Sequence, residues 1–195
     1  DGSAPIENAV FVVQNNIFDR NSTYYEGGAI RVRDSATITG NTFSNNSGCC
    51  SSGGAVRARN GATVTGNSFS GNYDDSGGAL WVEYSATISN NSFSGNSAAN
   101  HGGAIRISGS NTITGNSFTG NFGQYGGAIR AFDHGNTITQ NTFTNNGGRL
   151  GGALYVEYNH TIGRNLFVDN RVTYGDRRGA AVYVRGFHVA EPMRL

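Results

Sequence analysis

The stretch "GGAIRVRDSATITGNTFSNN", residues 27–46, contains the pattern that decides the fold. It has short runs in which apolar and polar residues alternate, so that Ile30 and Val32 lie on one side of an extended chain and Arg31 on the other. Ile38 is likewise flanked by two threonines. A spacing of two indicates β-strands, because apolar residues on one face of a helix recur every three to four positions. The Gly and Asn residues between the runs tolerate the positive φ of sharp corners.

This stretch returns along the whole chain with a period of 24–26 residues, which reaches 28 in the last copy. A phenylalanine followed three residues later by asparagine occurs seven times, at Phe18, Phe43, Phe69, Phe93, Phe118, Phe143 and Phe167. Two residues before each of them stands another asparagine: Asn16, Asn41, Asn67, Asn91, Asn116, Asn141 and Asn165. Gly-Gly-Ala begins at Gly27, Gly53, Gly77, Gly102, Gly126 and Gly151, with a degraded copy at Gly179. Repeats of this length are typical of solenoids.

We therefore predict an all-β fold, a single-stranded parallel β-helix of about seven coils of ~25 residues with three short strands in each coil. Residues 1–195 form one β-helix domain, with a lead-in over 1–9, coils over 10–185 and a tail over 186–195. The phenylalanines and aliphatic residues form internal ladders, because equivalent residues of successive coils lie above one another. The asparagines are expected to form structural ladders at the bends, where their amides can bond to backbone groups.

Composition narrows the range of functions. The net charge is +1 and all 14 basic residues are arginine, so we expect no nucleic-acid partner. The chain contains no apolar run of 18 residues, so we expect no membrane span. The four histidines, at 101, 134, 160 and 188, do not have the spacing of a zinc site. The sequence predicts no catalytic residues, no metal and no cofactor.

The alternation of GGA(I/L/V) with FxxN over residues 10–185 resembles the repeats of chlamydial polymorphic membrane proteins. These are autotransporter adhesins whose passenger domains are β-helices. The pattern is also similar to the general parallel β-helix repeat of secreted surface proteins and polysaccharide-active enzymes. The resemblance implies an extracellular or cell-surface location and an adhesive role, although a fold does not by itself determine activity.

Both ends of the chain have strand-forming sequences, "IENAVFVV" at 6–13 and "AAVYVRGFHVAEPMRL" at 180–195. A solenoid without caps presents strand edges to which another molecule can add, and head-to-tail addition does not close. We therefore expect a non-enzymatic structural or adhesive protein that binds copies of itself end to end, in a filament or surface layer. The rival interpretation is a segment of a longer adhesin whose flanking coils act as caps.

One candidate binding face is the outward column after each GGA motif. It consists of Arg31, Arg57, Trp81, Arg106, Arg130, Tyr155 and Tyr183. Arginines between aromatic rings can bind an anionic glycan or a host or cell surface through stacking and paired hydrogen bonds. The alternative is a solvated face whose cross-coil pairs, such as Arg59–Glu83, only relieve charge repulsion.

A second candidate face is rich in hydroxyl groups. Its threonines are Thr37, Thr39, Thr63, Thr65, Thr87, Thr112, Thr114, Thr137 and Thr139. A T-x-T array on a β-helix resembles the ice-binding face of some antifreeze proteins, so ice binding is an alternative function. Threonine also favours strands in general, and stacked threonines stabilise them.

The segment after each FxxN varies in length, from four residues in "YDDS" (73–76) to eight in "RVTYGDRR" (171–178). Variable loops on a fixed scaffold can carry recognition, but they are also where changes in length cost least. Polysaccharide binding or processing is a further alternative. For processing, however, Glu83 and Glu157 lie three coils apart, and Asp74-Asp75 fits a solvated turn better than a calcium site.

The chain has only two cysteines, Cys49 and Cys50, which are adjacent. They allow a strained vicinal disulfide, two thiols, or bonds to another chain. An extracellular location would favour oxidation. The sequence does not choose among these states.

Overall fold

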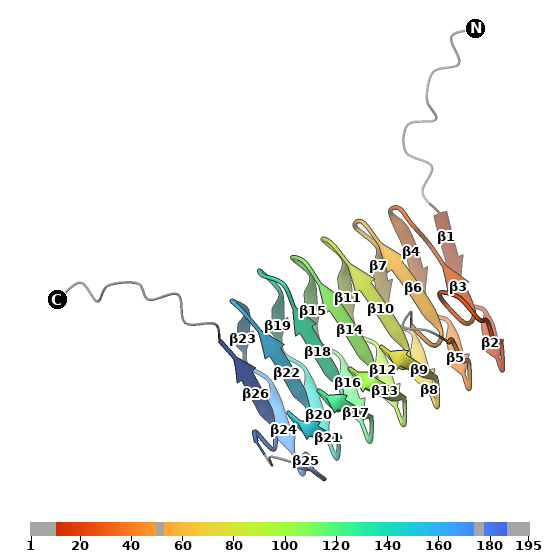
Figure 1. The fold of residues 1–195 in the computed structure, drawn as a ribbon. Coiled ribbons are helices and arrows are strands. Elements are labelled where there is room, and N and C mark those ends of the chain that lie inside the picture. Colours follow the sequence, from red (N-terminus) through yellow and green to blue (C-terminus); the bar gives the residue numbers. More distant parts are fainter. Residues whose placement is uncertain (1–10, 50–52, 174–177, 187–195) are drawn as a thin grey trace, which may run out of the picture.

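The computed structural model describes residues 11–49, 53–173 and 178–186. Within them every regular element is a β-strand, and every strand pairs in parallel with its equivalent one coil away (Figure 1). The predicted stacking of successive coils into a parallel β-helix is thereby confirmed. Three sheets have seven strands each, as expected for seven coils.

The strands of each sheet come from the same position of successive coils. The threonine sheet contains β1 (Phe11–Gln14), β4 (Ala36–Thr39), β7 (Thr63–Thr65), β11 (Thr87–Ser89), β15 (Thr112–Thr114), β19 (Thr137–Thr139) and β23 (Thr161–Gly163). The phenylalanine sheet contains β2 (Ile17–Asp19), β5 (Thr42–Ser44), β8 (Ser68–Ser70), β12 (Ser92–Ser94), β16 (Ser117–Thr119), β20 (Thr142–Thr144) and β24 (Leu166–Val168). The GGA sheet contains β3 (Ile30–Arg31), β6 (Val56–Arg59), β10 (Leu80–Glu83), β14 (Ile105–Ser108), β18 (Ile129–Phe132), β22 (Leu154–Glu157) and β26 (Val182–Arg185).

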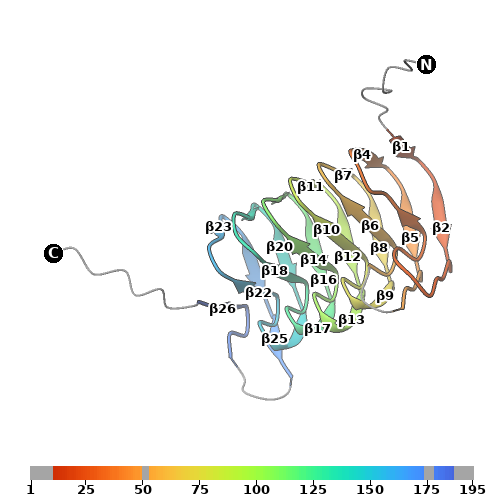
Figure 2. The ribbon, with the colours of Figure 1, turned by 45° about the horizontal axis from the view of Figure 1, so that its top comes forward.

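A fourth sheet corrects the expectation of three strands per coil. It contains β9 (Tyr73–Ser76), β13 (Ser97–His101), β17 (Phe122–Tyr125), β21 (Gly147–Leu150) and β25 (Arg171–Val172). These strands are the segments after FxxN that the sequence marked as loops, and they follow one another along one side of the coils (Figure 2). The segments 73–76, 97–101, 122–125 and 147–150 have four or five residues each, so their backbone groups meet one strand spacing apart and can pair. The longer segment 171–178 pairs with β21 through its first two residues, Arg171 and Val172. The extra residue of β13 is absorbed as an irregularity between Ala98 and His101.

The core contains an uninterrupted stack of phenylalanine rings. Neighbouring ring centroids lie 4.8–4.9 Å apart and neighbouring planes differ by 5–8°. The five inner rings, from Phe43 to Phe143, are fully buried, while Phe18 and Phe167 of the outer coils are partly buried. Aliphatic ladders from the threonine and GGA sheets complete the core.

The asparagines at the bends form amide ladders. The Asn67 side-chain amide donates to the Oδ1 atom of Asn91 at 3.0 Å and to the backbone oxygen of Ile38 at 2.9 Å. The same Oδ1 atom also accepts from the backbone N–H of Asn67 at 2.9 Å. Each buried amide is thus bonded to the coils on either side, which removes the cost of burying it. A second column behaves in the same way: Asn21, Asn46, Asn72, Asn96, Asn121, Asn146 and Asn170.

The GGA motif is explained by the close approach of backbones at one corner. The first glycine of the motif has a positive φ, as at Gly77 (+65°). A Cβ on the second, Gly78, would collide with the backbone oxygens of Gly103 and Ser97. No side chain fits at this position, so the repeat requires glycine there.

Candidate functional site

The outward column of the GGA sheet is packed as a cation–π stack. The guanidinium carbon of Arg57 lies 3.7 Å from the centroid of the Trp81 ring, and that of Arg106 lies 4.1 Å from the same ring. Arg106 also lies 4.7 Å from the ring of Phe132. Burial lowers the pKa of Arg106 to about 10, with the nearby Arg130 and Arg57 adding to the shift, so Arg106 stays protonated at neutral pH.

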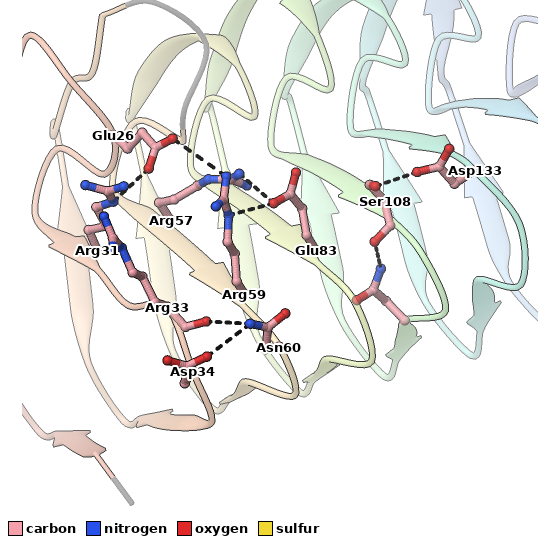
Figure 3. Close-up of polar contacts among 11 residues, drawn as sticks. Glu26, Arg31, Arg33, Asp34, Arg57, Arg59, Asn60, Glu83, Ser108 and Asp133 are labelled. Carbon is pink, nitrogen blue, oxygen red and sulfur yellow. Dashed lines mark hydrogen bonds and ion pairs between the residues drawn. The ribbon is translucent and has the colours of Figure 1, made fainter. Parts of the chain in front are cut away.

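Glutamates neutralise much of this column. The Glu83 carboxylate lies 2.7 Å from a terminal nitrogen of Arg57 and 2.7 Å from the Nε atom of Arg59 (Figure 3). Glu26 pairs with Arg31 at 2.7 Å in the preceding coil. Burial lowers the pKa of Arg57, and the Glu83 carboxylate opposes that shift. The Arg59–Glu83 ion pair expected from the sequence is therefore present. Glu83 also pairs with the buried Arg57, so this network is more enclosed than the solvated face that the alternative interpretation assumed.

At the other end of the column, Tyr155 stands among aromatic rings. Its centroid lies 5.3 Å from that of Tyr125 and 5.2 Å from that of Tyr183. Its hydroxyl donates to Glu157 at 3.0 Å, and Arg130 donates to the same carboxylate at 3.2 Å. A pocket of about 210 Å³ is lined by His101, Tyr125, Arg130, Tyr155, Glu157 and Arg185.

The side chains of the proposed glycan-binding column are therefore less exposed to solvent than the alternation of the sequence indicated. Arg57 and Tyr155 have exposed fractions of only 1% and 2%, because each is enclosed by stacked rings and a bonded carboxylate. Arg31 is exposed, and the other four members are partly exposed. Ligand binding by these five stays a prediction.

The threonine array is arranged as the repeat indicates. Thr37, Thr63, Thr87, Thr112 and Thr137 stand in register one coil apart. The column two residues further on contains Thr39, Thr65, Ser89, Thr114 and Thr139. Some hydroxyls bond across coils, as Ser89 does to Thr65 at 3.1 Å. These columns are partly or fully exposed, and ice binding by them stays a prediction.

A broad hollow lies over the fourth sheet. One pocket, of about 640 Å³, is lined by Tyr73, Ser97, Ala98, Ala99, Phe122, Gln124, Arg149 and Thr173. Another, of about 430 Å³, is lined by Gly120, Asn121, Phe122, Asn145, Gly147, Arg171 and Thr173. Because the two share Phe122 and Thr173, we treat them as one surface, the fourth-sheet groove.

Two exposed aromatic side chains belong to the same column of this groove. Tyr73 and Phe122 have exposed fractions of 47% and 42%, and Ser97 stands between them in register. They are two coils apart, ~9.6 Å at the usual strand spacing. In the next coil the column continues with Gly147, where an added Cβ would lie 3.3 Å from the Phe122 ring. The missing side chain of Gly147 thus leaves room beside that ring.

The groove carries positive charge and no described negative charge. Arg149 and Arg171 are exposed and line its two parts. The described lining residues include no Asp, Glu or His. The sequence analysis named the loops after FxxN as possible recognition elements, but it did not propose the aromatic residues or the arginines of this groove as binding residues. Aligning the copies places Tyr73 and Phe122 at one position, directly after the asparagine of FxxN.

The remaining candidate residues are dispersed. The His101 Nδ1 atom and the Ser76 hydroxyl form a hydrogen bond of 3.2 Å. Burial, together with the nearby Arg130 and Arg106, lowers the pKa of His101 to about 4. Asp74 is buried and accepts from the backbone N–H of Ser76 at 3.1 Å, so it does not lie in a solvated turn. Cys49 is exposed, while Cys50 and His188 lie outside the described residues.

A third polar ladder was missed by the sequence analysis. The Oδ1 atom of Asn111 accepts from the backbone N–H of Ala86 at 3.0 Å, and Asn111 donates to Asn136 at 2.9 Å. Asn136 in turn contacts His160. The earlier coils have alanine at this position, at Ala36, Ala62 and Ala86, so the change to a polar residue was the available signal.

In the described part of the chain, we find no helix long and apolar enough to cross a membrane. Comparison with known proteins yields one family model, NosD, described as a periplasmic copper-binding protein, which matches residues 6–183. No curated protein and no solved structure matches. None of these comparisons shows the expected resemblance to chlamydial polymorphic membrane proteins.

Proposed function

The chain belongs to the NosD family, and we propose that it is a non-enzymatic protein outside the cytoplasm that holds an extended polysaccharide along the fourth-sheet groove. The description of the family as periplasmic supports a location outside the cytoplasm. The observation that carries the proposal is the pair Tyr73 and Phe122, two exposed aromatic rings aligned in one groove.

The chemistry of the groove fits a sugar chain. The apolar faces of sugar rings stack on aromatic side chains, while their hydroxyls need hydrogen-bonding groups beside the rings. Ser97, Gln124 and Thr173 supply such groups in the same hollow. A concave surface that combines aromatic rings with a few polar groups is the usual form of a ligand site.

The rigidity of the scaffold favours binding. Tyr73, Ser97 and Phe122 stand on hydrogen-bonded strands whose order is set by the pairing of coils. A ligand that lies along the coil axis therefore meets rings already held in position. Such preorganisation reduces the entropy lost on binding.

The lining argues for binding without catalysis. Most glycoside hydrolases use a pair of carboxylates that flank the bond to be cleaved. The described residues of the groove offer no carboxylate and no histidine for that role. This supports the non-enzymatic part of the proposal.

The test is the affinity of the chain for a panel of soluble polysaccharides, measured by isothermal titration calorimetry. The double variant Tyr73→Ala/Phe122→Ala should lose about 1–3 kcal/mol of binding free energy if each ring contributes about 0.5–1.5 kcal/mol. The matched control is Tyr24→Ala, which removes a ring that is 84% exposed and does not line the groove. Equal binding by the double variant and the wild type would refute the proposal, as would the absence of binding to any member of the panel.

End-to-end self-association is a second candidate, favoured by the outer coils. Phe11 and Ile17 in the first coil are 59% and 79% exposed, and Leu166 and Val184 in the last are 57% and 61% exposed. β1 and β26 are terminal strands of their sheets, so each pairs on one side with a described strand. Apolar groups beside such an edge favour the addition of another copy, in a filament or layer at the cell surface. Sedimentation at increasing concentration tests this, and a monomer at every concentration would exclude it.

Copper is not part of the proposal, although the family's description names it. Copper sites use thiolate, thioether or imidazole ligands. Among the described residues no three His, Cys, Asp or Glu side chains lie close enough together to hold a metal ion. The described coils do not fit a copper site, and no step of the proposed function involves the metal.

A further inference from the structure

We propose that the C-terminal end of the fourth-sheet groove is a carboxylate subsite, in which Arg149 and Arg171 bind an acidic sugar of the polysaccharide. This inference rests on the proposed glycan groove and names the class of its occupant, an extended chain that carries uronate groups.

The two arginines are placed to share one anionic group. Arg149 belongs to β21 and Arg171 to β25, the neighbouring strand of the fourth sheet. Arg171 stands in register with Gly147, two residues before Arg149. One strand spacing and two residues along the strand separate their Cα atoms by ~8 Å. Both side chains are long enough to reach a carboxylate held between them, and a guanidinium can bond both of its oxygens.

The arginines of the groove differ from those of the GGA sheet in their charge balance. On the GGA sheet, Arg57 and Arg59 share Glu83, and Arg130 pairs with Glu157. Neither Arg149 nor Arg171 forms an ion pair with another described residue. The positive charge of the groove is therefore available to an anionic ligand.

The position of Phe122 joins this charge to the aromatic part of the groove. Phe122 lines both pockets, one shared with Tyr73 and Arg149 and the other with Arg171. A sugar ring stacked on Phe122 thus lies between an aromatic platform and the two cations. A uronate provides both groups in one unit, a ring face for Phe122 and a carboxylate for the arginines.

The probes are a galacturonate hexamer and its methyl ester, which keeps the sugar skeleton and removes the charge. Calorimetry with the whole chain should show the ester binding about tenfold or more weakly than the acid, as expected when charge-assisted hydrogen bonds are lost. In the variant Arg149→Gln/Arg171→Gln the acid and the ester should bind alike. The control Arg20→Gln/Arg33→Gln removes two exposed charges outside the groove and should preserve the difference.

The outcomes separate this inference from the proposed function. Equal binding of acid and ester by the wild type, lost in Tyr73→Ala/Phe122→Ala, would overturn the carboxylate subsite and leave the glycan groove standing. Undiminished discrimination in Arg149→Gln/Arg171→Gln would also overturn it. Binding of neither hexamer, and of no neutral oligosaccharide, would overturn both. Unchanged far-ultraviolet circular dichroism establishes that each variant is folded.

Discussion

Substituting one asparagine of a buried ladder tests how the bends are held together. In Asn91→Ala the side chain loses four hydrogen bonds: two accepted from Asn67, one donated to the backbone oxygen of Val64, and one donated to Asn116, all at 2.9–3.0 Å. The backbone N–H of Asn67 is left buried without its partner. The other three groups are affected less. The Asn67 side-chain amide still donates to the backbone oxygen of Ile38, and the Asn116 Oδ1 atom still accepts from the backbone N–H of Asn91. The backbone oxygen of Val64 has a second lone pair that can accept another hydrogen bond.

The magnitude follows from this count. Leaving one buried donor without a bond costs about 1–3 kcal/mol, and each of the other three lost bonds costs about 0.5–1.5 kcal/mol. The substitution should therefore lower the free energy of unfolding by about 2.5–7.5 kcal/mol. That is a large share of the 5–15 kcal/mol that is typical of a whole domain.

The assay is urea unfolding followed by circular dichroism, with two comparison variants. Asn16→Ala removes the same side chain from the first coil, where Asn16 is exposed and water can replace its bonds. Asn100→Ala removes an exposed asparagine outside the ladders and should change stability by less than about 0.5 kcal/mol. If Asn16→Ala and Asn91→Ala cost the same, burial is not the source of the effect, and the reasoning is refuted.

Three further substitutions test other parts of the structure. Gly78→Ala should prevent close stacking of the coils, because its Cβ would collide with the Gly103 backbone oxygen; a melting temperature equal to that of the wild type would contradict this. Glu83→Gln should destabilise the fold by about 3–5 kcal/mol in urea unfolding, since the Arg57 guanidinium is 1% exposed and would lose its carboxylate. The folded-state pKa of His101, about 4, lies below the usual histidine value of 6.5, so the unfolded chain binds more protons between these values. Stability should therefore fall as the pH drops from 6.5 to 4, and His101→Gln should reduce that slope in urea titrations.

The coil and its interior were predictable because the sequence of each repeat contains the pattern that specifies them. The alternation around Ile38 and the spacing from there to Phe43 recur in every copy, so the apolar columns could be listed without coordinates. The bends were equally readable, since a buried amide at Asn67 has a partner only if the next coil repeats it at Asn91.

The exposure of the outward columns was not predictable in the same way. Alternation places Arg57 on the outer side of its strand, yet stacking on Trp81 and pairing with Glu83 from the next coil leave it 1% exposed. Those contacts depend on which residue the neighbouring coil brings alongside. A single coil therefore cannot reveal whether an outward side chain meets solvent.

The sequence by itself determined the β-helix, its seven coils and the identity of its internal columns, because a repeated period-two pattern leaves one way to bury the apolar residues. Only the tertiary structure decided that the segments after FxxN pair into a fourth sheet and that Tyr73, Phe122, Arg149 and Arg171 share one groove. The reason is that pairing between those segments depends on the backbone path of adjacent coils, and that the residue type at each position of these segments differs from coil to coil.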